Sequence, residues 1–195
     1  MVLAELLASE GEPDEVAARV IDAALAEFTE FGLRRVSVAD VAVRAGVHRA
    51  TAYRRFPSKD DLVVAASITW TRRFFEGVLA AVAGFDTFED RLIEGFVLSL
   101  STFRADPLVQ RVLVTDRDAM LPYLTTEGGP VLATVSAFFA DQFRSAAPDR
   151  PDLEVTAEVM ARIGLSLLLT PESRAALESD DEIRAFAHRY LLPLI

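Results

Sequence analysis

Apolar residues recur at helical spacing along almost the whole of this 195-residue chain. The first clear stripe, over about residues 14 to 31, has apolar side chains at steps of three and four: Val16, Val20, Ile21, Ala24, Leu25 and Phe28. This spacing puts them on one face of a helix, which can then be buried. No alternation with the period of two that a half-buried strand requires extends beyond a few residues. The sequence therefore predicts an all-α fold.

Residues with capping chemistry predict where the helices begin and end. Gly32 is placed to end the first helix, and Ser37 begins a second helix that ends at Gly46. A third helix follows over residues 48 to 56, and Ser58 begins a longer fourth. Five or six further helices are expected to begin near Thr87, Asp106, Pro130, Asp149, Thr170 and Ser179. The predicted architecture is a small three-helix bundle followed by a larger helical body.

Residues 37 to 56 have the pattern of two short helices that cross at a tight turn. Gly46 can take the left-handed backbone conformation of such a turn, and Ala42 and Ala52 are small enough to let the helices approach closely. The opposite face of the second helix then carries Arg49, Ala50, Tyr53 and Arg54. In a major groove, arginine can pair with guanine, and tyrosine or alanine can contact the thymine methyl group. The segment is therefore predicted to be a DNA-binding helix-turn-helix.

The distribution of charge agrees with this prediction. The whole chain carries a net charge of −10, which by itself disfavours a nucleic-acid binder, because phosphate contacts require Lys and Arg. From Arg34 to Lys59, however, seven cationic residues and one acid give a net charge of +6, which leaves −16 for the remainder. A basic patch on an acidic body is the electrostatic footprint of a DNA-binding protein.

Four motifs occur together between residues 16 and 64. The first predicted helix ends in Phe31-Gly32, and the turn reads Ala45-Gly46-Val47. The next helix contains Tyr53-Arg-Arg-Phe56, and Ser58-Lys59 begins the fourth. In this combination the segment resembles the DNA-binding domain of the TetR family of bacterial regulators.

The resemblance implies a division of the chain and a set of DNA contacts. Residues 1–13 would be a short N-terminal extension, and residues 14–61 a three-helix helix-turn-helix DNA-binding domain. Residues 62–195 would form a larger helical domain for ligand binding and dimerisation. Base edges would be contacted by Arg49, Ala50, Tyr53 and Arg54. Phosphates would be held by Ser37, Thr51, Arg55 and Lys59, although Arg55 could equally point to solvent. His48 departs from the family's usual Ser or Thr at the cap of the recognition helix and could instead contact phosphate.

The resemblance also implies an effector pocket in the larger domain. Its candidate walls are aromatic: Trp70, Phe74, Phe96, Phe103, Tyr123 and Phe138. The same rings could instead belong to the core. An acidic group of the effector could be anchored by Arg72, Arg73 or Arg117, each of which could also be an ordinary surface residue. The expected effector is small and largely apolar or aromatic.

Dimerisation is predicted for the last two helices of the chain. Their candidate interface residues are Ala157, Ala161, Gly164, Leu168, Phe186 and Tyr190. The small residues would let a second helix approach closely, and two such pairs around a two-fold axis would form a four-helix bundle. The alternative is that the same stripe packs inside one subunit.

The basic patch and the helix-turn-helix together predict a DNA-binding transcriptional regulator. The resemblance implies that it is ligand-responsive, specifically a repressor that binds a palindromic DNA operator as a homodimer and is released by a small effector. A DNA-binding protein without a ligand is one alternative, and a helical-bundle enzyme is another. The enzyme has little support, because di-metal bundles use Glu-x-x-His pairs and neither histidine of the chain stands in one. No catalytic residue is expected.

The remaining expectations concern cofactors and location. The chain has no cysteine, which excludes disulfides and thiolate zinc sites, and no metal or cofactor is expected. Apolar runs such as residues 163 to 169 are far shorter than the roughly 20 residues that span a bilayer, so no membrane association is expected. These features favour a cytoplasmic protein.

Overall fold

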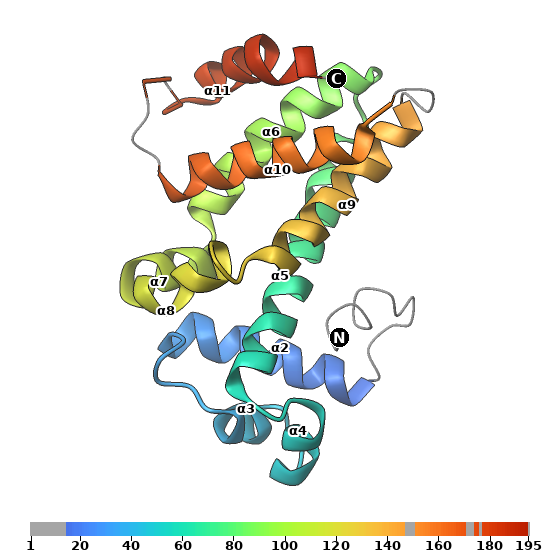
Figure 1. The fold of residues 1–195 in the computed structure, drawn as a ribbon. Helices are drawn as coiled ribbons and strands as arrows, with labels where there is room; N and C mark the ends of the chain where they lie inside the picture. The colour runs from blue at the N-terminus through green and yellow to red at the C-terminus, as the bar shows by residue number, and fades with distance from the viewer. Residues whose placement is uncertain (1–14, 147–150, 171–173, 176, 195) are drawn as a thin grey trace. The chain divides into compact units, whose positions relative to one another are not determined.

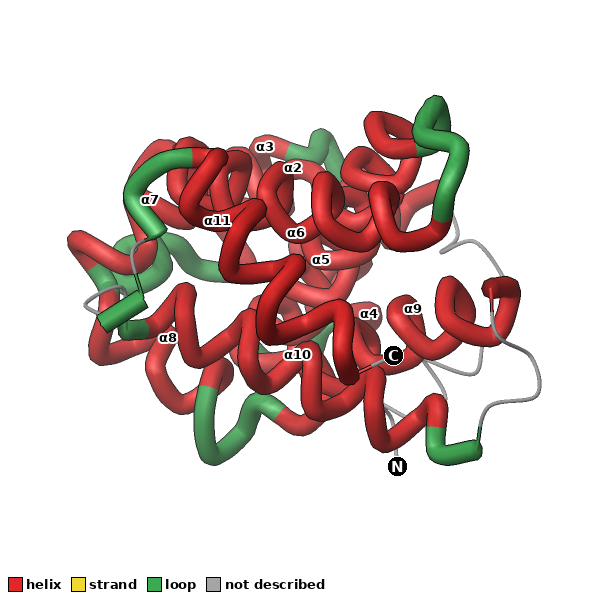
Figure 2. The backbone as a smooth tube through the Cα atoms, turned by 90° about the horizontal axis from the view of Figure 1, so that it is seen from above, coloured by secondary structure: helices red, strands yellow, loops and turns green. Residues whose placement is uncertain are grey.

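The computed structural model describes residues 15–146, 151–170, 174–175 and 177–194. Every regular element in this part of the chain is helical and none is a strand, which confirms the predicted all-α class (Figure 1; Figure 2). The α-helices are α2 (Glu15–Phe31), α3 (Val38–Arg44), α4 (Arg49–Arg55), α5 (Lys59–Val82), α6 (Phe88–Ala105), α7 (Pro107–Thr115), α8 (Arg117–Leu124), α9 (Gly129–Ala146), α10 (Leu153–Leu169) and α11 (Asp180–Phe186). A π-helical turn and a 3-10 turn continue from α11, namely η1 (Ala187–Leu191) and η2 (Leu192–Leu194).

Local hydrogen bonds explain why several helices begin where the sequence predicts. At α3, the backbone N–H of Asp40 donates to Ser37 Oγ, and the Asp40 carboxylate accepts from the Ser37 N–H. Ser179 and Glu182 form the same reciprocal pair of bonds at α11, and the Asp106 carboxylate caps α7. These bonds satisfy backbone donors that a helix leaves free at its first turn. The starts predicted at 37, 106 and 179 are confirmed.

Other starts differ from the prediction or fall outside the described residues. Helix α9 begins at Gly129, one residue before the predicted Pro130. Helix α10 begins at Leu153, and the predicted start at Asp149 lies outside the described residues. Thr170 follows the last residue of α10, and residues 171 to 173, where the next helix is predicted, are also outside the described part.

The segment after Asp106 contains two helices where the predicted starts allow for one. Helix α7 ends at Thr115 and α8 begins at Arg117, so Asp116 lies between them. Asp116 occupies the N-cap position of α8 but makes no side-chain capping bond there. Its carboxylate accepts a hydrogen bond from the backbone N–H of Leu33 instead, 83 residues away in sequence. The break between α7 and α8 thus coincides with a long-range contact, which a local pattern does not reveal.

The helices form two compact units. The first contains the described residues within 1–71 and 106–131, and the second contains those within 72–105 and 132–195. Helices α7 and α8 therefore belong, by their contacts, to the same unit as the helix-turn-helix. Packing of α7 against α2 accounts for this grouping. The domain boundary near residue 61 stays a prediction.

The first unit has one core, and α2 supplies much of it. Val20 and Ala24 of α2 are fully buried, and Phe28 is 3% exposed. Helices α3, α4, α5 and α7 contribute to the same cluster through Val41, Ala52, Leu62 and Val112. Burial of an aliphatic or aromatic side chain stabilises a fold by about 1.5–3 kcal/mol. The helix-turn-helix is thus packed on α2 together with α7.

The core of the second unit is rich in aromatic rings. Phe143 is 1% exposed and its ring stacks on that of Phe139, with 6.1 Å between the ring centroids. Phe96 of α6 stacks on Phe186 of α11 with the same centroid separation. Offset and edge-to-face ring pairs of this kind stabilise a core beyond simple burial.

An ion pair also joins α6 to α11 in the second unit. The Arg184 guanidinium donates two hydrogen bonds to the Glu94 carboxylate, one of them 2.9 Å long from Nη2 to Oε2. The hydrogen bond from Arg184 holds the pKa of Glu94 below its ordinary value of 4.5. A carboxylate with a lowered pKa stabilises the folded state above its unfolded pKa and loses that contribution as the pH falls.

We predict that Arg184→Met lowers the melting temperature by a few degrees at pH 7, and that this difference from the wild type shrinks as the pH falls below about 4.5, the ordinary range of a glutamate. Thermal unfolding followed by circular dichroism between pH 3 and 7 measures it. Arg91→Met is the matched control, because Arg91 lies on α6 and donates to the Phe85 carbonyl rather than to a carboxylate. A pH-independent effect of Arg184→Met would contradict the assignment.

Candidate nucleic-acid interface

The turn between α3 and α4 is held by backbone and side-chain hydrogen bonds. Gly46 has a φ of +64°, as predicted for this turn, and the Val47 N–H donates to the Ala42 carbonyl at 3.0 Å. Arg19 of α2 donates through Nη2 to the carbonyls of Ala45 at 2.6 Å and Gly46 at 3.3 Å. These carbonyls lie at the C-terminal end of α3, where a cation interacts favourably with the helix dipole. Arg19 therefore ties α2 to the turn ahead of α4.

Helix α4 separates a buried side from an exposed side. Ala52 is fully buried and Phe56, which follows the helix, is 6% exposed. The four predicted base-contacting residues, Arg49, Ala50, Tyr53 and Arg54, are all exposed. Tyr53, a large ring, is 45% exposed. The structure thus brings the four side chains onto the solvent-facing part of one short helix, as a recognition helix requires.

The residues predicted to hold phosphates differ in their exposure and in their hydrogen bonds. The Ser37 hydroxyl is engaged in the α3 capping box, where it donates to Asp40 Oδ2 at 2.6 Å. Lys59, at the first position of α5, is partly buried and donates through Nζ to the Arg34 carbonyl at 3.4 Å. Thr51 is partly buried, and Arg55 is exposed. Lys59 therefore lies against the loop before α3.

His48 is the N-cap residue of α4. Its side chain makes no capping hydrogen bond, unlike the Ser or Thr that is usual in the family at this position. The residue is exposed beside the exposed face of α4.

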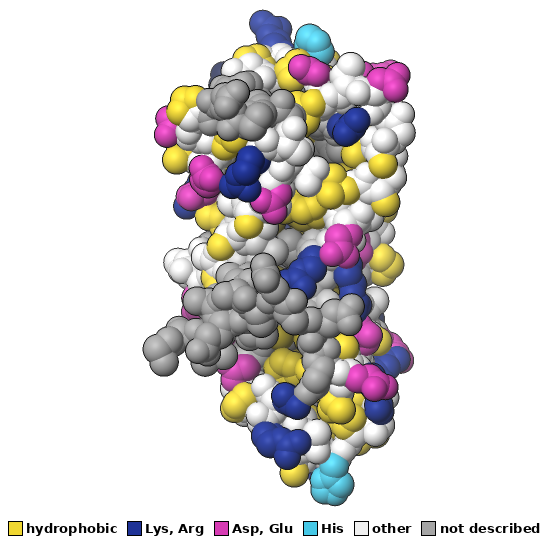
Figure 3. Space-filling view, turned by 90° about the vertical axis from the view of Figure 1, so that its right-hand side faces the viewer, with side chains coloured by type: hydrophobic (Ala, Val, Ile, Leu, Met, Phe, Trp, Pro, Cys, Tyr) yellow, Lys and Arg dark blue, Asp and Glu magenta, His cyan; other side chains and the backbone are white. Residues whose placement is uncertain are grey.

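Some of the cationic side chains between residues 34 and 59 are paired with acids of the described residues. Arg44 of α3 donates to Glu27 at 2.8 Å and to Glu30 at 2.9 Å, both on α2. Arg34 lies 3.4 Å from Asp118 of α8. The net charge of +6 therefore overstates what this stretch offers to DNA, because a neutralised guanidinium attracts phosphate less. Figure 3 shows Lys and Arg side chains at the lower end of the view, the end that holds α3 and α4 in Figure 1.

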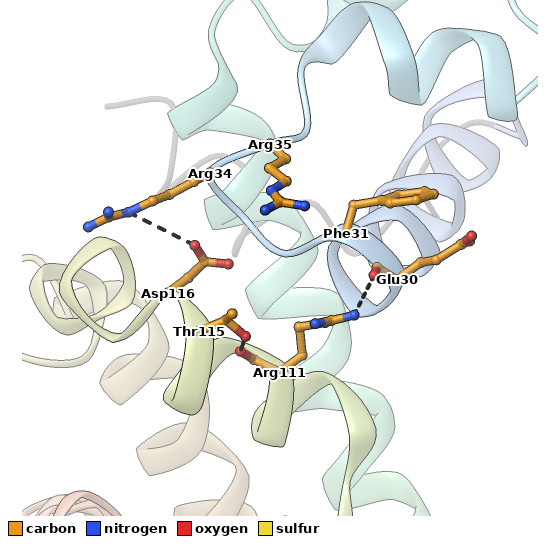
Figure 4. A pocket seen from close by; sticks show the side chains of 7 residues that line it. All are labelled: Glu30, Phe31, Arg34, Arg35, Arg111, Thr115 and Asp116. Carbon is orange, nitrogen blue, oxygen red and sulfur yellow. Dashed lines mark hydrogen bonds and ion pairs between the residues drawn. The ribbon is translucent and has the colours of Figure 1, made fainter.

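A pocket of about 250 Å³ lies within the first unit (Figure 4). It is lined by Glu30, Phe31, Arg34, Arg35, Arg111, Thr115 and Asp116. Arg111 of α7 donates to the carbonyls of Thr29 and Glu30, the latter at 2.7 Å, and so binds the C-terminal end of α2. None of the aromatic residues predicted to bind the effector lines this pocket.

Those six aromatic residues are divided between the two units. Phe74, Phe96, Phe103 and Phe138 lie in the second unit, where Phe74 and Phe103 meet edge to face. Trp70 and Tyr123 lie in the first unit, and their polar groups donate to Asp106 at 3.3 Å and to Asp60 at 2.8 Å. The three candidate arginine anchors, Arg72, Arg73 and Arg117, are all exposed. Arg117 donates to the Leu113 carbonyl of its own unit.

The predicted dimer residues differ in their exposure. Ala157 is fully buried and Ala161 is 4% exposed, so both pack within their own chain, as the alternative reading of this stripe had it. Gly164, Leu168 and Phe186 are partly buried, and Tyr190 is 54% exposed. The apolar side chains that α10 leaves exposed are Val155 at 62% and Val159 at 42%.

The sequence patterns missed Arg19 and Asp116. Arg19 lies on the first helix, 26 residues before its acceptor at Ala45, and Asp116 lies 83 residues after Leu33. Neither residue stands in a motif. Only the folded arrangement brings each to the helix-turn-helix.

Comparison with known families decides the class of the protein. Residues 20–66 match the family described as "Bacterial regulatory proteins, tetR family", and residues 88–189 match that described as "Bacterial Tetracyclin repressor, C-terminal domain". The chain belongs to the TetR family. It is accordingly a DNA-binding helix-turn-helix transcription regulator and not an enzyme.

Individual relatives agree with this assignment. The chain is 27% identical over 162 residues to the HTH-type transcriptional regulator AlkX of Mycobacterium tuberculosis, a match covering 81% of this chain and 74% of the relative. Among solved structures, the TetR family repressor AlkX from Dietzia sp. strain DQ12-45-1b, implicated in biodegradation of n-alkanes, has a TM-score of 0.75 at 22% identity and covers 94% of this chain and 97% of its own. The multidrug binding protein EbrR complexed with imidazole has a TM-score of 0.62 at 24% identity, covering 94% and 96%.

Two further observations are limited to the described residues. None of their helices is long and apolar enough to cross a membrane. No three His, Asp or Glu side chains among them are grouped as a metal site would require.

Proposed function

We propose that this TetR-family regulator is a repressor that binds a palindromic operator as a homodimer and is released by a small, largely apolar or aromatic effector. The observation that carries the proposal is the exposed face of α4, where Arg49, Tyr53 and Arg54 lie together on a helix whose other side is buried. The protein would act in the cytoplasm, on the DNA that it regulates.

Sequence readout is assigned to α4. Arg49 and Arg54 can each donate two hydrogen bonds to the O6 and N7 atoms of a guanine, and Tyr53 and Ala50 can contact thymine methyl groups. Lys59 is assigned to phosphate, at the N-terminus of a long helix whose dipole favours an anion. Ser37, Thr51 and Arg55 would complete the phosphate contacts, and exposed His48 could join them.

The effector response is inferred from the family and from the composition of the second unit. The AlkX structure is that of a repressor implicated in n-alkane biodegradation, and EbrR binds imidazole in its structure. The second unit of this chain contributes Phe74, Phe96, Phe103 and Phe138 to a ring-rich interior. Such an interior favours an apolar or aromatic ligand over a highly charged one.

Helix α5 offers a route from effector to DNA. It is one helix from Lys59 to Val82, so the predicted phosphate contact and Phe74 belong to the same helix. A ligand that favours one tilt of α5 would change the separation of the two recognition helices in a dimer. DNA affinity would fall because half-site spacing in the operator is fixed.

Dimerisation is assigned to α10 and the turn after α11. Val155, Val159 and Tyr190 are large apolar side chains left exposed on these elements. Val155 and Val159 lie one helical turn apart on α10, and a group of exposed apolar side chains is common at protein interfaces. A two-fold pairing of α10 and α11 with a second copy would cover them.

Selection of bound sequences from random DNA tests the proposed readout. We predict an inverted repeat, and we expect Arg49→Ala and Arg54→Ala each to cost about 1–3 kcal/mol on it and to relax the preference at one position of each half-site. Lys59→Ala should weaken all sequences alike and lower the slope of log affinity on log salt by about one. Arg91→Ala, which removes a surface charge from the second unit, is the control. Unchanged preference in both α4 variants would remove α4 from the readout.

The effector response is tested with a panel of linear alkanes, fatty acids and aromatic acids. We expect at least one compound to raise the melting temperature, to release the selected operator and to change the fluorescence of Trp70, the single tryptophan. Trp70 reports on α5 because its indole N–H donates to Asp106 across to α7. A compound that stabilises the protein but leaves operator binding intact would contradict release. If no compound of these classes binds, a DNA-binding protein without such an effector is favoured.

The dimer surface is tested by charge substitution. We predict that Val155→Glu combined with Val159→Glu weakens self-association at least tenfold in sedimentation equilibrium, because two carboxylates would be buried without partners across the interface. Leu121→Glu is the control, since Leu121 is 43% exposed on α8, outside the proposed interface. A variant that remains as dimeric as the wild type would place the interface elsewhere.

A further inference from the structure

The loop between α2 and α3 is held by a carboxylate from the junction of α7 and α8. Asp116 is 5% exposed, and its Oδ2 accepts a hydrogen bond of 2.8 Å from the Leu33 N–H. Its Oδ1 lies 3.9 Å from Arg34 Nε. Figure 4 shows this carboxylate turned toward the loop. A buried carboxylate is costly unless it is bonded and paired, and here both partners come from the loop.

The loop makes room for this carboxylate through a glycine. Gly32 has a φ of +81°, which favours glycine on backbone grounds alone. A Cβ at this position would also lie only 2.2 Å from Asp116 Oδ2, well inside contact distance. The backbone at Gly32 and the carboxylate of Asp116 are therefore fitted to each other.

Asp116 makes this contact and does not cap the helix that it precedes. It stands at the N-cap of α8, where an aspartate ordinarily accepts from the backbone of the first turn, but it makes no such bond. An Asp that leaves its own helix uncapped and bonds to a distant loop indicates that the loop contact is the more favourable one.

The loop that Asp116 holds leads directly into the DNA-binding elements. Ser37, which caps α3, ends this loop, and the carbonyl of Arg34 within it accepts from Lys59 Nζ. Movement of the loop would therefore shift the start of α3 and remove the acceptor of Lys59. Ser37, at the start of α3, and Lys59 are both among the proposed phosphate contacts.

The α7–α8 segment also holds the other end of the helix-turn-helix. Tyr123 of α8 donates through its hydroxyl to Asp60 Oδ1, at the first turn of α5, at 2.8 Å. Burial, with the hydrogen bond to Asp60, raises the pKa of Tyr123 to about 12. The helix-turn-helix is thus bonded to this segment just before it begins, at Leu33, and just after it ends, at Asp60.

We propose that Asp116 is a positioning residue for DNA binding: its carboxylate, through the Leu33 N–H and Arg34, fixes the loop that sets the start of α3 and the place of Lys59. The residue touches no DNA. The proposal needs only that the protein binds DNA, and it stands whether or not an effector releases that DNA.

Substitutions that separate the acceptor from the charge test this role. Asp116→Ala and Asp116→Leu remove the acceptor, the first with a loss of side-chain volume and the second with a gain, and each should weaken binding to the selected operator at least tenfold. Asp116→Asn keeps an oxygen acceptor for the Leu33 N–H and should stay within about threefold of the wild type. Asp118→Ala is the matched control, because Asp118 also meets Arg34, at 3.4 Å, but is 86% exposed, and the Leu33 N–H donates to Asp116 instead. It should change the affinity by less than twofold.

Two further measurements distinguish positioning from general stability. Hydrogen exchange of the amides of residues 33 to 36 should accelerate in Asp116→Ala and Asp116→Leu and return toward the wild-type rate in Asp116→Asn. The slope of log affinity on log salt should fall in the first two variants toward that of Lys59→Ala. All assays are made well below the melting temperature of each variant, and either acceptor-free variant suffices if the other does not fold.

Wild-type affinity and salt slope in an acceptor-free variant would overturn the proposal. So would equal losses of affinity in Asp116→Asn and Asp116→Ala without faster exchange in the loop. A wild-type protein that selects no DNA sequence would instead count against the proposed readout by α4, and the two failures are thereby distinguishable.

Discussion

Burial of one face of α2 is the interaction on which the DNA-binding unit depends. Val20 and Ala24 are fully buried in a cluster to which α3, α4, α5 and α7 each contribute at least one side chain. Helices α3 and α4 have seven residues each, too few to persist alone in water, where isolated helices shorter than about 12–15 residues are marginal. Their position, and hence the direction of the exposed face of α4, is therefore set by packing on α2. Burial makes the contact with α2 favourable, and the hydrogen bonds of Arg19 and Arg44 fix the orientation of α3 and of the turn on α2.

Features that arise from neighbours in sequence could be predicted. The capping box at Ser37 and the left-handed Gly46 involve residues within one turn, so local chemistry was enough to place them. The exposed side of α4 followed from helical periodicity once Ala52 was assigned to the core. The break at Asp116 could not be predicted in this way, because its cause is an N–H group 83 residues away. Asp116 in the sequence is indistinguishable from an ordinary helix cap.

Charge and residue size were informative but incomplete for the same reason. The net charge of +6 between residues 34 and 59 pointed to the correct segment, yet Arg44 is bonded to two glutamates of α2 that lie outside it. The small residues of α10 do mark close packing, but Ala157 and Ala161 are buried within their own chain. A stripe of small side chains indicates that a helix is approached closely and does not identify which helix approaches it. The exposed fractions show that Val155 and Val159, and not Ala157 and Ala161, lie on the solvent-facing side of α10.

The grouping of α7 and α8 with the helix-turn-helix bears on the proposed effector response. In that proposal, a tilt of α5 would act on the recognition helix through the start of α5, at Lys59 and Asp60. The α7–α8 segment contacts the same region through Tyr123 and the opposite end of the motif through Asp116. A change that moved α5 without α7 and α8 would have to break the bond between Tyr123 and Asp60 and that between Trp70 and Asp106. The less costly motion carries these helices together, so the loop before α3 would follow α5 through the carboxylate of Asp116.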